Sequence, residues 1–364
     1  MIVVYDLRYA SDHFPGIGAH AHALLVALLA ADDTTRFRVL WRPGERVTRF
    51  DPAAIACQPR VEWHESLAPA LGFSAPFTTG AWLRRLGGDV YLSPFYLQPV
   101  RAGMPVVLTL HDVMHMAPGV SSPWGVRWRV ALALAAARSA DAVVTSSRFS
   151  RDEIIRRAGL SPARVHVVPL GVPASCPAPA QRPAGMLDGP FTLTVGGNRP
   201  HKNLATLARV WRAFGADAPL SLVSVGPVDA RFPTLASLGA GSRAVALGAV
   251  APAELEWLYS QAVMLLFPTC YEGFGLPLVE AAARGLPVIA SDIPALREIG
   301  EGVARFVPPG DVAAWAVAVR TLAADDAGRD AMRAAGIVRA GTFGYDRCAR
   351  AVRAIVNRVS RRAA

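Results

Sequence analysis

A buried strand, a glycine-containing loop and a helix follow one another in residues 262–285. The first six residues are an apolar run with the length and composition of a buried parallel strand, and Pro268 ends it. Gly273 and Gly275 keep the next loop free of side-chain bulk, so a ligand can approach the backbone closely. Pro277 suits the first turn of a helix. Repeated units of this kind predict a parallel sheet covered by helices.

The loop in this unit brings polar groups to the start of the expected helix. The backbone N–H groups of Phe274, Gly275 and Leu276 point to a helix N-terminus, which receives anions and sugar oxygens well. Glu272 precedes that terminus and Glu280 lies one turn inside it. Both carboxylates can accept hydrogen bonds from a polyol. The alternative is an ordinary strand–loop–helix joint with two solvated glutamates.

The residues between the two glutamates are Gly-Phe-Gly-Leu-Pro followed by Leu-Val. Together with Glu272 and Glu280 they resemble the EGFGLP signature of retaining glycosyltransferases of the family-4 type. The resemblance implies the α/β fold called GT-B, in which two Rossmann-like domains face a cleft and a C-terminal helix crosses back to the first domain. It further implies that Glu272 and the loop amides hold the donor sugar, and that Glu280 holds the ribose.

The length of 364 residues suits two domains, each with its own core. Residues 173–190 contain five prolines and are expected to be a linker. The boundaries predicted from it are an acceptor domain at 1–172, a nucleotide-sugar domain at 191–344 and a basic crossover helix at 345–364. The expected strands are residues 2–5, 37–41, 89–91, 106–110, 140–145, 165–170, 191–195, 221–226, 245–247, 262–267 and 288–291, with a helix at 19–31.

Gly16 and Gly18 stand just before this first expected helix, where a glycine loop suits a phosphate. With Ala21 they match a dinucleotide-binding fingerprint, but they lie about ten residues beyond the strand rather than in its first turn. The resemblance implies instead that they face the donor diphosphate. Ala19 stands where the family often has arginine, so the contact would be made mostly by backbone. A structural tight turn is the alternative.

His111 follows the expected strand 106–110, at the sheet edge where α/β proteins place ligands. The resemblance implies that it faces the reacting sugar and the acceptor, whereas the residue type alone also suits a capping or core imidazole. His115 could make a metal pair with it, but no third ligand is near in sequence. The chain contains no Asp-x-Asp, so the usual carboxylates for a metal–diphosphate bridge are missing. We therefore expect no metal and no cofactor.

The segment 196–203 contains the single lysine, Lys202, among 38 cationic residues. Lys202 and Arg199 near a helix start can neutralise a diphosphate as charge develops on it. The family carries Lys-Asn at this point, often after an arginine, whereas this chain has His201 there. Two solvated surface cations are the alternative. By resemblance alone, Val250 would lie beside the nucleobase.

The net charge of +10 is uneven, because the last 20 residues hold six arginines and one aspartate. Basic proteins of this kind bind nucleic acid, anionic membranes or anionic substrates. No zinc finger or RNP motif favours nucleic acid, so no nucleic-acid partner is expected. Segments 82–86 and 124–129 interleave tryptophan and arginine, which suits a membrane surface. Ordinary helix faces with arginine stems over apolar surface are the alternative. No signal peptide or long apolar run is evident, which predicts a cytoplasmic protein. The basic last helix and the tryptophan–arginine segments lead to the further hypothesis that it is peripheral at the inner membrane face.

The resemblance implies a retaining hexosyltransferase of the kind used in bacterial polysaccharide biosynthesis, and the missing Asp-x-Asp adds that it is metal-independent. The donor would be a nucleoside diphosphate sugar, with GDP-mannose preferred on family likeness, and the acceptor a glycan or a lipid-linked molecule. His111, Glu272 and Lys202 would be its catalytic residues. A GT-B sugar-nucleotide epimerase, an NAD-dependent dehydrogenase and a non-enzymatic carbohydrate-binding protein remain as alternatives.

Overall fold

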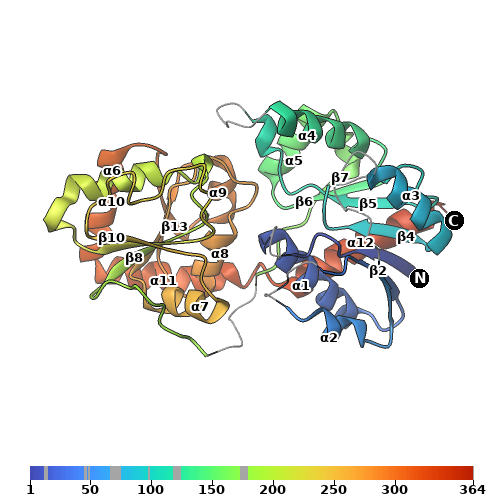
Figure 1. Cartoon of the computed structure of the whole chain (residues 1–364), viewed down its shortest axis with the longest axis horizontal. Helices are drawn as coiled ribbons and strands as arrows, with labels where there is room; N and C mark the ends of the chain where they lie inside the picture. Colours follow the sequence, from blue (N-terminus) through green and yellow to red (C-terminus); the bar gives the residue numbers. More distant parts are fainter. Residues whose placement is uncertain are drawn as a thin grey trace. The chain divides into compact units, whose positions relative to one another are not determined.

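The computed structural model describes residues 1–11, 15–44, 47, 50–65, 75–96, 99–117, 124–172 and 179–363. The chain forms two compact units; it leaves the first after Gly171 and returns to it at Tyr345 (Figure 1). Part of the predicted linker, residues 173–178, lies outside the described residues. Within the described ranges, no helix has both the length and the apolar character needed to cross a membrane.

In the described part of the first unit, the sheet has seven parallel strands in the order β3-β2-β1-β4-β5-β6-β7. They are β1 (Ile2–Asp6), β2 (Arg36–Trp41), β3 (Val61–Glu65), β4 (Val90–Ser93), β5 (Val106–Thr109), β6 (Ala142–Thr145) and β7 (Val165–Val167). Val4 pairs with Arg38 on one side and with Tyr91 on the other. The order therefore reverses between β1 and β4, and such a switch point is where doubly wound sheets bind ligands.

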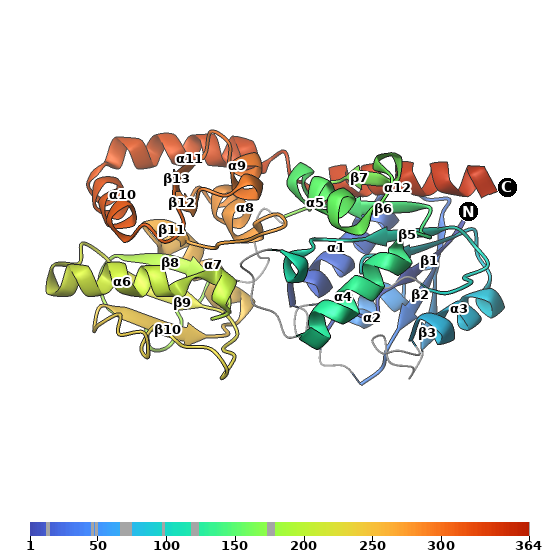
Figure 2. The ribbon, with the colours of Figure 1, turned by 90° about the horizontal axis from the view of Figure 1, so that it is seen from above.

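Helices pack on this sheet, and the last one comes from the far end of the chain. They are α1 (Pro15–Ala31), α2 (Pro52–Ala56), α3 (Ala75–Leu86), α4 (Trp124–Ala137), α5 (Arg148–Ala158) and α12 (Tyr345–Ala363), with short turns η1 (Met114–Met116) and η2 (Pro162–Arg164). Helix α12 contacts α1 and strands β4 to β6, and Figure 2 shows it lying along this unit. Its buried residues are Cys348, Ala349, Val352, Ile355, Val356 and Val359. The predicted apolar side and the return of the chain are thus confirmed.

The second unit repeats the same winding, with the strand order β10-β9-β8-β11-β12-β13 in the part that is described. Its strands are β8 (Phe191–Val195), β9 (Ser221–Val225), β10 (Ala244–Gly248), β11 (Met264–Phe267), β12 (Val288–Ser291) and β13 (Ala304–Val307). Its helices are α6 (Leu204–Phe214), α7 (Pro252–Gln261), α8 (Leu276–Ala283), α9 (Pro294–Ile299), α10 (Val312–Ala324) and α11 (Asp326–Ala340), with turns η3 (Pro200–Lys202) and η4 (Gly215–Asp217). Trp211 and Trp315 fill its core.

These two parallel, doubly wound sheets confirm the predicted pair of Rossmann-like domains. Some strand limits differ from the prediction for local reasons. The strand expected from residue 262 begins at Met264, because the N–H of Ala262 caps α7 by bonding to the Leu258 carbonyl oxygen at 3.0 Å. The strand expected over 165–170 ends at Val167, since Pro169 has no N–H for the ladder.

The predicted glycine loop before residue 19 is wrong. Helix α1 already begins at Pro15, so Gly16 and Gly18 lie in its first turn. Proline at the first helical position costs no hydrogen bond there, because the first N–H groups of a helix have no acceptor inside it. A Cβ atom at Gly18 would lie only 3.1 Å from the Cα of Ala10. Glycine therefore stands at this position because the helix packs closely on the backbone of Ala10.

Candidate active site

The loop after β11 is held in one shape by a glycine that no other residue could replace without strain. Gly275 has φ +100° and is the N-cap residue of α8, in the left-handed region that favours glycine. A Cβ there would come within 2.5 Å of the Leu296 Cδ2 atom. The side chain of Phe274 is buried and packs edge-on against Phe343 at 5.6 Å. With the Phe274 side chain buried and no side chain on Gly275, the backbone N–H groups of Phe274, Gly275 and Leu276 lie at the helix N-terminus.

Hydrogen bonds tie this loop to the turn η3 at the end of β8. The carbonyl oxygen of His201 accepts from the Cys270 N–H at 2.7 Å and from the Thr269 hydroxyl at 2.9 Å. The amide of Asn203, whose φ is +54°, donates to the Pro268 carbonyl oxygen at 3.0 Å. These bonds place residue 202 opposite residue 272.

Lys202 and Glu272 consequently form an ion pair, with Nζ 2.6 Å from Oε1. Their side chains are only 21% and 15% exposed, so the pair is shielded but reachable. The lysine stem passes Gly196, where a Cβ would lie 3.3 Å from its Cδ and Cε atoms, and Nζ lies 5.4 Å from the centre of the Phe267 ring. An anionic ligand that enters here meets an ammonium group whose present partner is a carboxylate.

Arg199 does not join this pair. It is exposed at the N-cap position of η3, and it helps to hold the pKa of Asp229 at about 2, after the larger effect of the hydrogen bonds from Arg231. Asn198 next to it anchors the loop after β9 by donating to the carbonyl oxygens of Asp229 and Phe232. Arg199 thus stands as an exposed cation at the rim of the η3 turn.

Glu280 is fixed by the neighbouring helix α7. The hydroxyl of Tyr259 donates to its Oε2 atom at 2.7 Å. Arg284 donates to the Glu280 carbonyl oxygen at 3.0 Å and pairs with Glu256 at 2.7 Å. Val250 is half-buried in the loop between β10 and α7, so it lies at the carboxyl end of an edge strand of the same sheet.

In the first unit, His111 follows β5 and lies beside a second histidine. Its Nε2 lies 3.2 Å from the Pro94 carbonyl oxygen, and burial lowers the pKa of the His111 ring, against the opposing charge of Asp112. His20 of α1 packs edge-on against it, with ring centres 5.7 Å apart, and Tyr345 stacks on His20 at 5.8 Å. Burial lowers the pKa of His20 to about 3, with a smaller effect from His111, so its imidazole is neutral.

Comparisons with known proteins assign the family. A model described as Glycosyltransferase Family 4 matches residues 15–175, and one described as Glycosyl transferases group 1 matches residues 189–325. The O-antigen chain mannosyltransferase B of Escherichia coli is 28% identical over 284 residues, 74% of either protein. A D-inositol 3-phosphate glycosyltransferase of Xylanimonas cellulosilytica is 30% identical over 287 residues, 71% of this chain and 67% of the relative. The chain belongs to glycosyltransferase family 4.

Solved structures of glycosyltransferases share the fold. WaaG, a glycosyltransferase involved in lipopolysaccharide biosynthesis, is 17% identical, with a TM-score of 0.72 over 97% of this chain and 99% of the other. Anabaena Alr3699/HepE in complex with UDP-glucose is 19% identical, with a TM-score of 0.70 over 98% of this chain and 99% of the other. The two doubly wound sheets are therefore those of a GT-B glycosyltransferase.

The sequence predicted that Lys202 and Glu272 of this glycosyltransferase lie in one site. It did not predict the residues that contact Glu280 and His111. Tyr259 and Glu256 lie on α7, and no motif marks them, because their role comes from the packing of α7 on α8. His20 lies two residues beyond Gly18, and a histidine on a helix expected to be core gave no distinct signal. Within the described residues, no group of three side chains of metal-binding type comes together.

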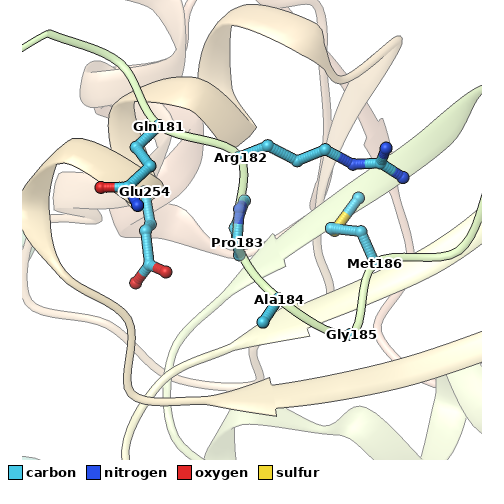
Figure 3. A pocket seen from close by; sticks show the side chains of 7 residues that line it. All are labelled: Gln181, Arg182, Pro183, Ala184, Gly185, Met186 and Glu254. Atoms are coloured by element: carbon cyan, nitrogen blue, oxygen red, sulfur yellow. The ribbon is translucent and has the colours of Figure 1, made fainter.

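A cavity of about 400 Å³ in the second unit lies apart from these residues. Gln181, Arg182, Pro183, Ala184, Gly185, Met186 and Glu254 line it. Figure 3 shows Arg182 extending away from Glu254, and most of the lining residues are exposed. It contains none of the predicted site residues.

Proposed function

We propose that this glycosyltransferase moves a hexose from a nucleoside diphosphate sugar to an acceptor with retention of anomeric configuration. The observation that carries the proposal is the ion pair of Lys202 and Glu272 beside the N-terminus of α8. A cation, a carboxylate and free backbone N–H groups are what a diphosphate joined to a polyol requires.

In this proposal the donor separates the pair. The ammonium group of Lys202 turns to the diphosphate, and Arg199 approaches it from the rim. Glu272 then accepts hydrogen bonds from the hydroxyls of the sugar, together with the amides of Phe274, Gly275 and Leu276. As the bond from the anomeric carbon to the diphosphate breaks, negative charge grows on the leaving phosphate, and Lys202 stabilises it more in the transition state than in the ground state. Glu280 receives the ribose, and Val250 borders the base.

The first unit supplies the rest of the reaction in this proposal. The first turn of α1 offers the backbone at Gly16 to the diphosphate, because a helix N-terminus favours negative charge, and Gly18 lets this turn pack closely on Ala10. His111 faces the transferred sugar and the acceptor hydroxyl. Its ring donates from Nε2 to Pro94, which fixes the ring and leaves Nδ1 as the free acceptor nitrogen.

For the substrates, we propose mannose carried by GDP and a glycan or lipid-linked acceptor in polysaccharide synthesis. The name of the E. coli relative, an O-antigen chain mannosyltransferase, supports the sugar. The UDP-glucose bound by the Anabaena protein supports a nucleotide-sugar donor but points to another base and sugar. The epimerase alternative has no support among these relatives.

We further propose that the reaction needs no metal and that the acceptor is met at an anionic membrane surface. The absence of Asp-x-Asp and the presence of Lys202 and Arg199 support metal independence. Exposed Trp124 and Trp128 on α4, with Arg127 between them, support the membrane surface.

Thermal shift against GDP-mannose, UDP-glucose and ADP-glucose tests the donor, because a ligand that binds only the folded state raises its melting temperature. We expect GDP-mannose to raise the melting temperature most. Addition of EDTA should not reduce this rise, because no metal is needed. Proton NMR of the product, made with a mannose-ending glycan, reads the anomeric configuration. No stabilisation by any of the three, or an inverted product, contradicts the proposal. Isomerised donor without acceptor would instead identify an epimerase.

A further inference from the structure

The carboxylate of Glu280 is held at one oxygen and open at the other. Tyr259 donates to Oε2 at 2.7 Å, and no residue in the described ranges donates to Oε1. Tyr259 itself is 2% exposed, so its hydroxyl is shielded from water and bonds to Glu280. A carboxylate clamped in this way presents its remaining lone pairs in a fixed direction.

An ion pair between the same two helices holds Tyr259. Arg284, one residue beyond α8, places its guanidinium over the Tyr259 ring with Cζ 5.0 Å from the ring centre. Glu256, one turn before Tyr259 on α7, accepts from Arg284 Nε at 2.9 Å and from Nη2 at 2.7 Å. The side chains of Arg284 and Glu256 are 11% and 16% exposed. The tyrosine ring is thus packed on a cation that is itself anchored to α7.

In the hydrogen bond between Tyr259 and Glu280, the tyrosine hydroxyl is the donor. Burial raises the pKa of Tyr259 well above its ordinary value, and the Glu280 carboxylate adds to this effect. The hydroxyl therefore stays protonated and always donates. Glu280 accepts, and its open oxygen suits another donor, such as a hydroxyl of a sugar.

We propose that Tyr259 is the positioning residue that makes the donor site select ribonucleotides over deoxyribonucleotides. The inference rests on the proposed function, in which Glu280 receives the ribose. Tyr259 orients Glu280 before the nucleotide arrives, so the bond from the ribose hydroxyl to Oε1 forms without ordering a free side chain. A nucleotide that lacks this hydroxyl leaves the fixed carboxylate without its donor, and binds more weakly.

The test compares affinities of GDP and UDP with those of their 2′-deoxy and 3′-deoxy forms by isothermal titration calorimetry. We expect the wild-type protein to prefer the ribose form of the bound nucleotide by about ten-fold or more, the value of a lost hydrogen bond to a charged group. Tyr259→Phe keeps the ring under Arg284 and should reduce the preference to a few-fold, mainly by weakening the ribose form. KM for the donor should rise while kcat stays near that of the wild type. Glu280→Gln should reduce the preference as well.

Two further variants distinguish the loss of Glu280 positioning from a general loss of stability. Tyr5→Phe deletes a buried hydroxyl that donates to the Ala21 carbonyl oxygen at 2.6 Å in the first unit, and should leave the preference unchanged. Glu256→Gln weakens the hold on Arg284 and should reduce the preference partly, even if Tyr259→Phe folds poorly. A wild-type preference in Tyr259→Phe and Glu256→Gln overturns the inference, as does a wild-type protein that binds both sugar forms equally. A wild-type protein that binds no nucleotide defeats the proposed function instead.

Discussion

At the scale of single residues, Lys202 carries the most specific prediction. The other cationic residues are all arginines, yet the residue paired with Glu272 at 2.6 Å is a lysine. Its stem runs 3.3 Å from the Cβ position of Gly196, so the space is shaped for a slender chain ending in a compact ammonium group. Arginine brings a broad planar fork and a longer reach. We infer that the fork displaces the diphosphate from its reacting position.

Lys202→Arg should therefore lose at least about ten-fold in kcat/KM although the net charge is unchanged, since a shift of about 1 Å can cost a hundred-fold. Lys202→Ala should lose more, because the leaving diphosphate then meets no cation from this position. Steady-state kinetics with the donor found by thermal shift provide the measurement. Arg209→Lys, an exposed arginine on α6, is the matched control and should behave as wild type. Wild-type efficiency in Lys202→Arg would mean that the single lysine has no role.

Substitution of Glu272 should lower the reaction rate without weakening nucleotide binding. In the proposed reaction, Glu272→Gln removes a charged acceptor from the transferred sugar and should lower kcat by about one to two decades, the equivalent of roughly 1.5–3 kcal/mol. The affinity for the free nucleoside diphosphate, measured by calorimetry, should stay within a few-fold, because that ligand lacks the sugar. A rate equal to that of the wild type would remove Glu272 from the reaction.

At the scale of elements, the sequence predicts those parts whose signals are local. The apolar run, the glycines and Pro277 sufficed for β11, its loop and α8. Strand β3, by contrast, is an edge strand with polar Glu62 and His64, and half-burial left it no continuous apolar run. The start of α1 was missed because glycine weakens a helix, whereas here close packing on Ala10 requires Gly18.

In the candidate site, too, the sequence predicts single residues from local patterns but not the contacts between distant segments. Glu272 and Lys202 could be chosen from their own segments, but their pairing depends on hydrogen bonds from the loop after β11 to His201, which no local pattern encodes. Tyr259 could not be chosen at all, since its partner is 21 residues away on another helix.

The N-terminus of α8 should be sensitive to a single methyl group. Gly275→Ala places a residue at φ +100° and a Cβ 2.5 Å from the Cδ2 atom of Leu296, a side chain that is fully buried. Gly310→Ala is a matched control, because Gly310 has φ +94° but no atom within 4 Å of its Cβ position. In urea unfolding, Gly310→Ala should cost about 1–2 kcal/mol for the backbone alone. Gly275→Ala should cost about 1–3 kcal/mol more for the clash and weaken nucleotide binding. Equal losses of unfolding free energy in the two variants would show that the Leu296 side chain moves aside without cost.

At the scale of the whole molecule, charge and exposed aromatic rings point to a surface partner. The exposed arginines of α12 are Arg347, Arg350, Arg358, Arg361 and Arg362. Of the two tryptophan–arginine segments, only α4 offers its rings to solvent: Trp124 is 78% and Trp128 is 54% exposed, and they stack at 6.0 Å. Trp82 is instead half-buried, with Arg8 placed over its ring at 5.7 Å. The candidate membrane contact is thereby narrowed to α4 and the basic side of α12.

Sedimentation with vesicles tests this contact and separates its two parts. Vesicles that contain phosphatidylglycerol should bind the protein at low salt, and vesicles of phosphatidylcholine alone should not, because each arginine near an anionic surface contributes about 1 kcal/mol. Arg361→Gln with Arg362→Gln should weaken binding chiefly at low salt, where charge is least screened. Trp124→Ala with Trp128→Ala should weaken it at every salt concentration, because burial of an aromatic ring in the interface does not depend on screening. Phe77→Ala, an aromatic residue 64% exposed on α3, is the control and should bind as wild type. Absence of binding to anionic vesicles at low salt would exclude the membrane surface as a partner and leave a soluble glycan as the acceptor to test.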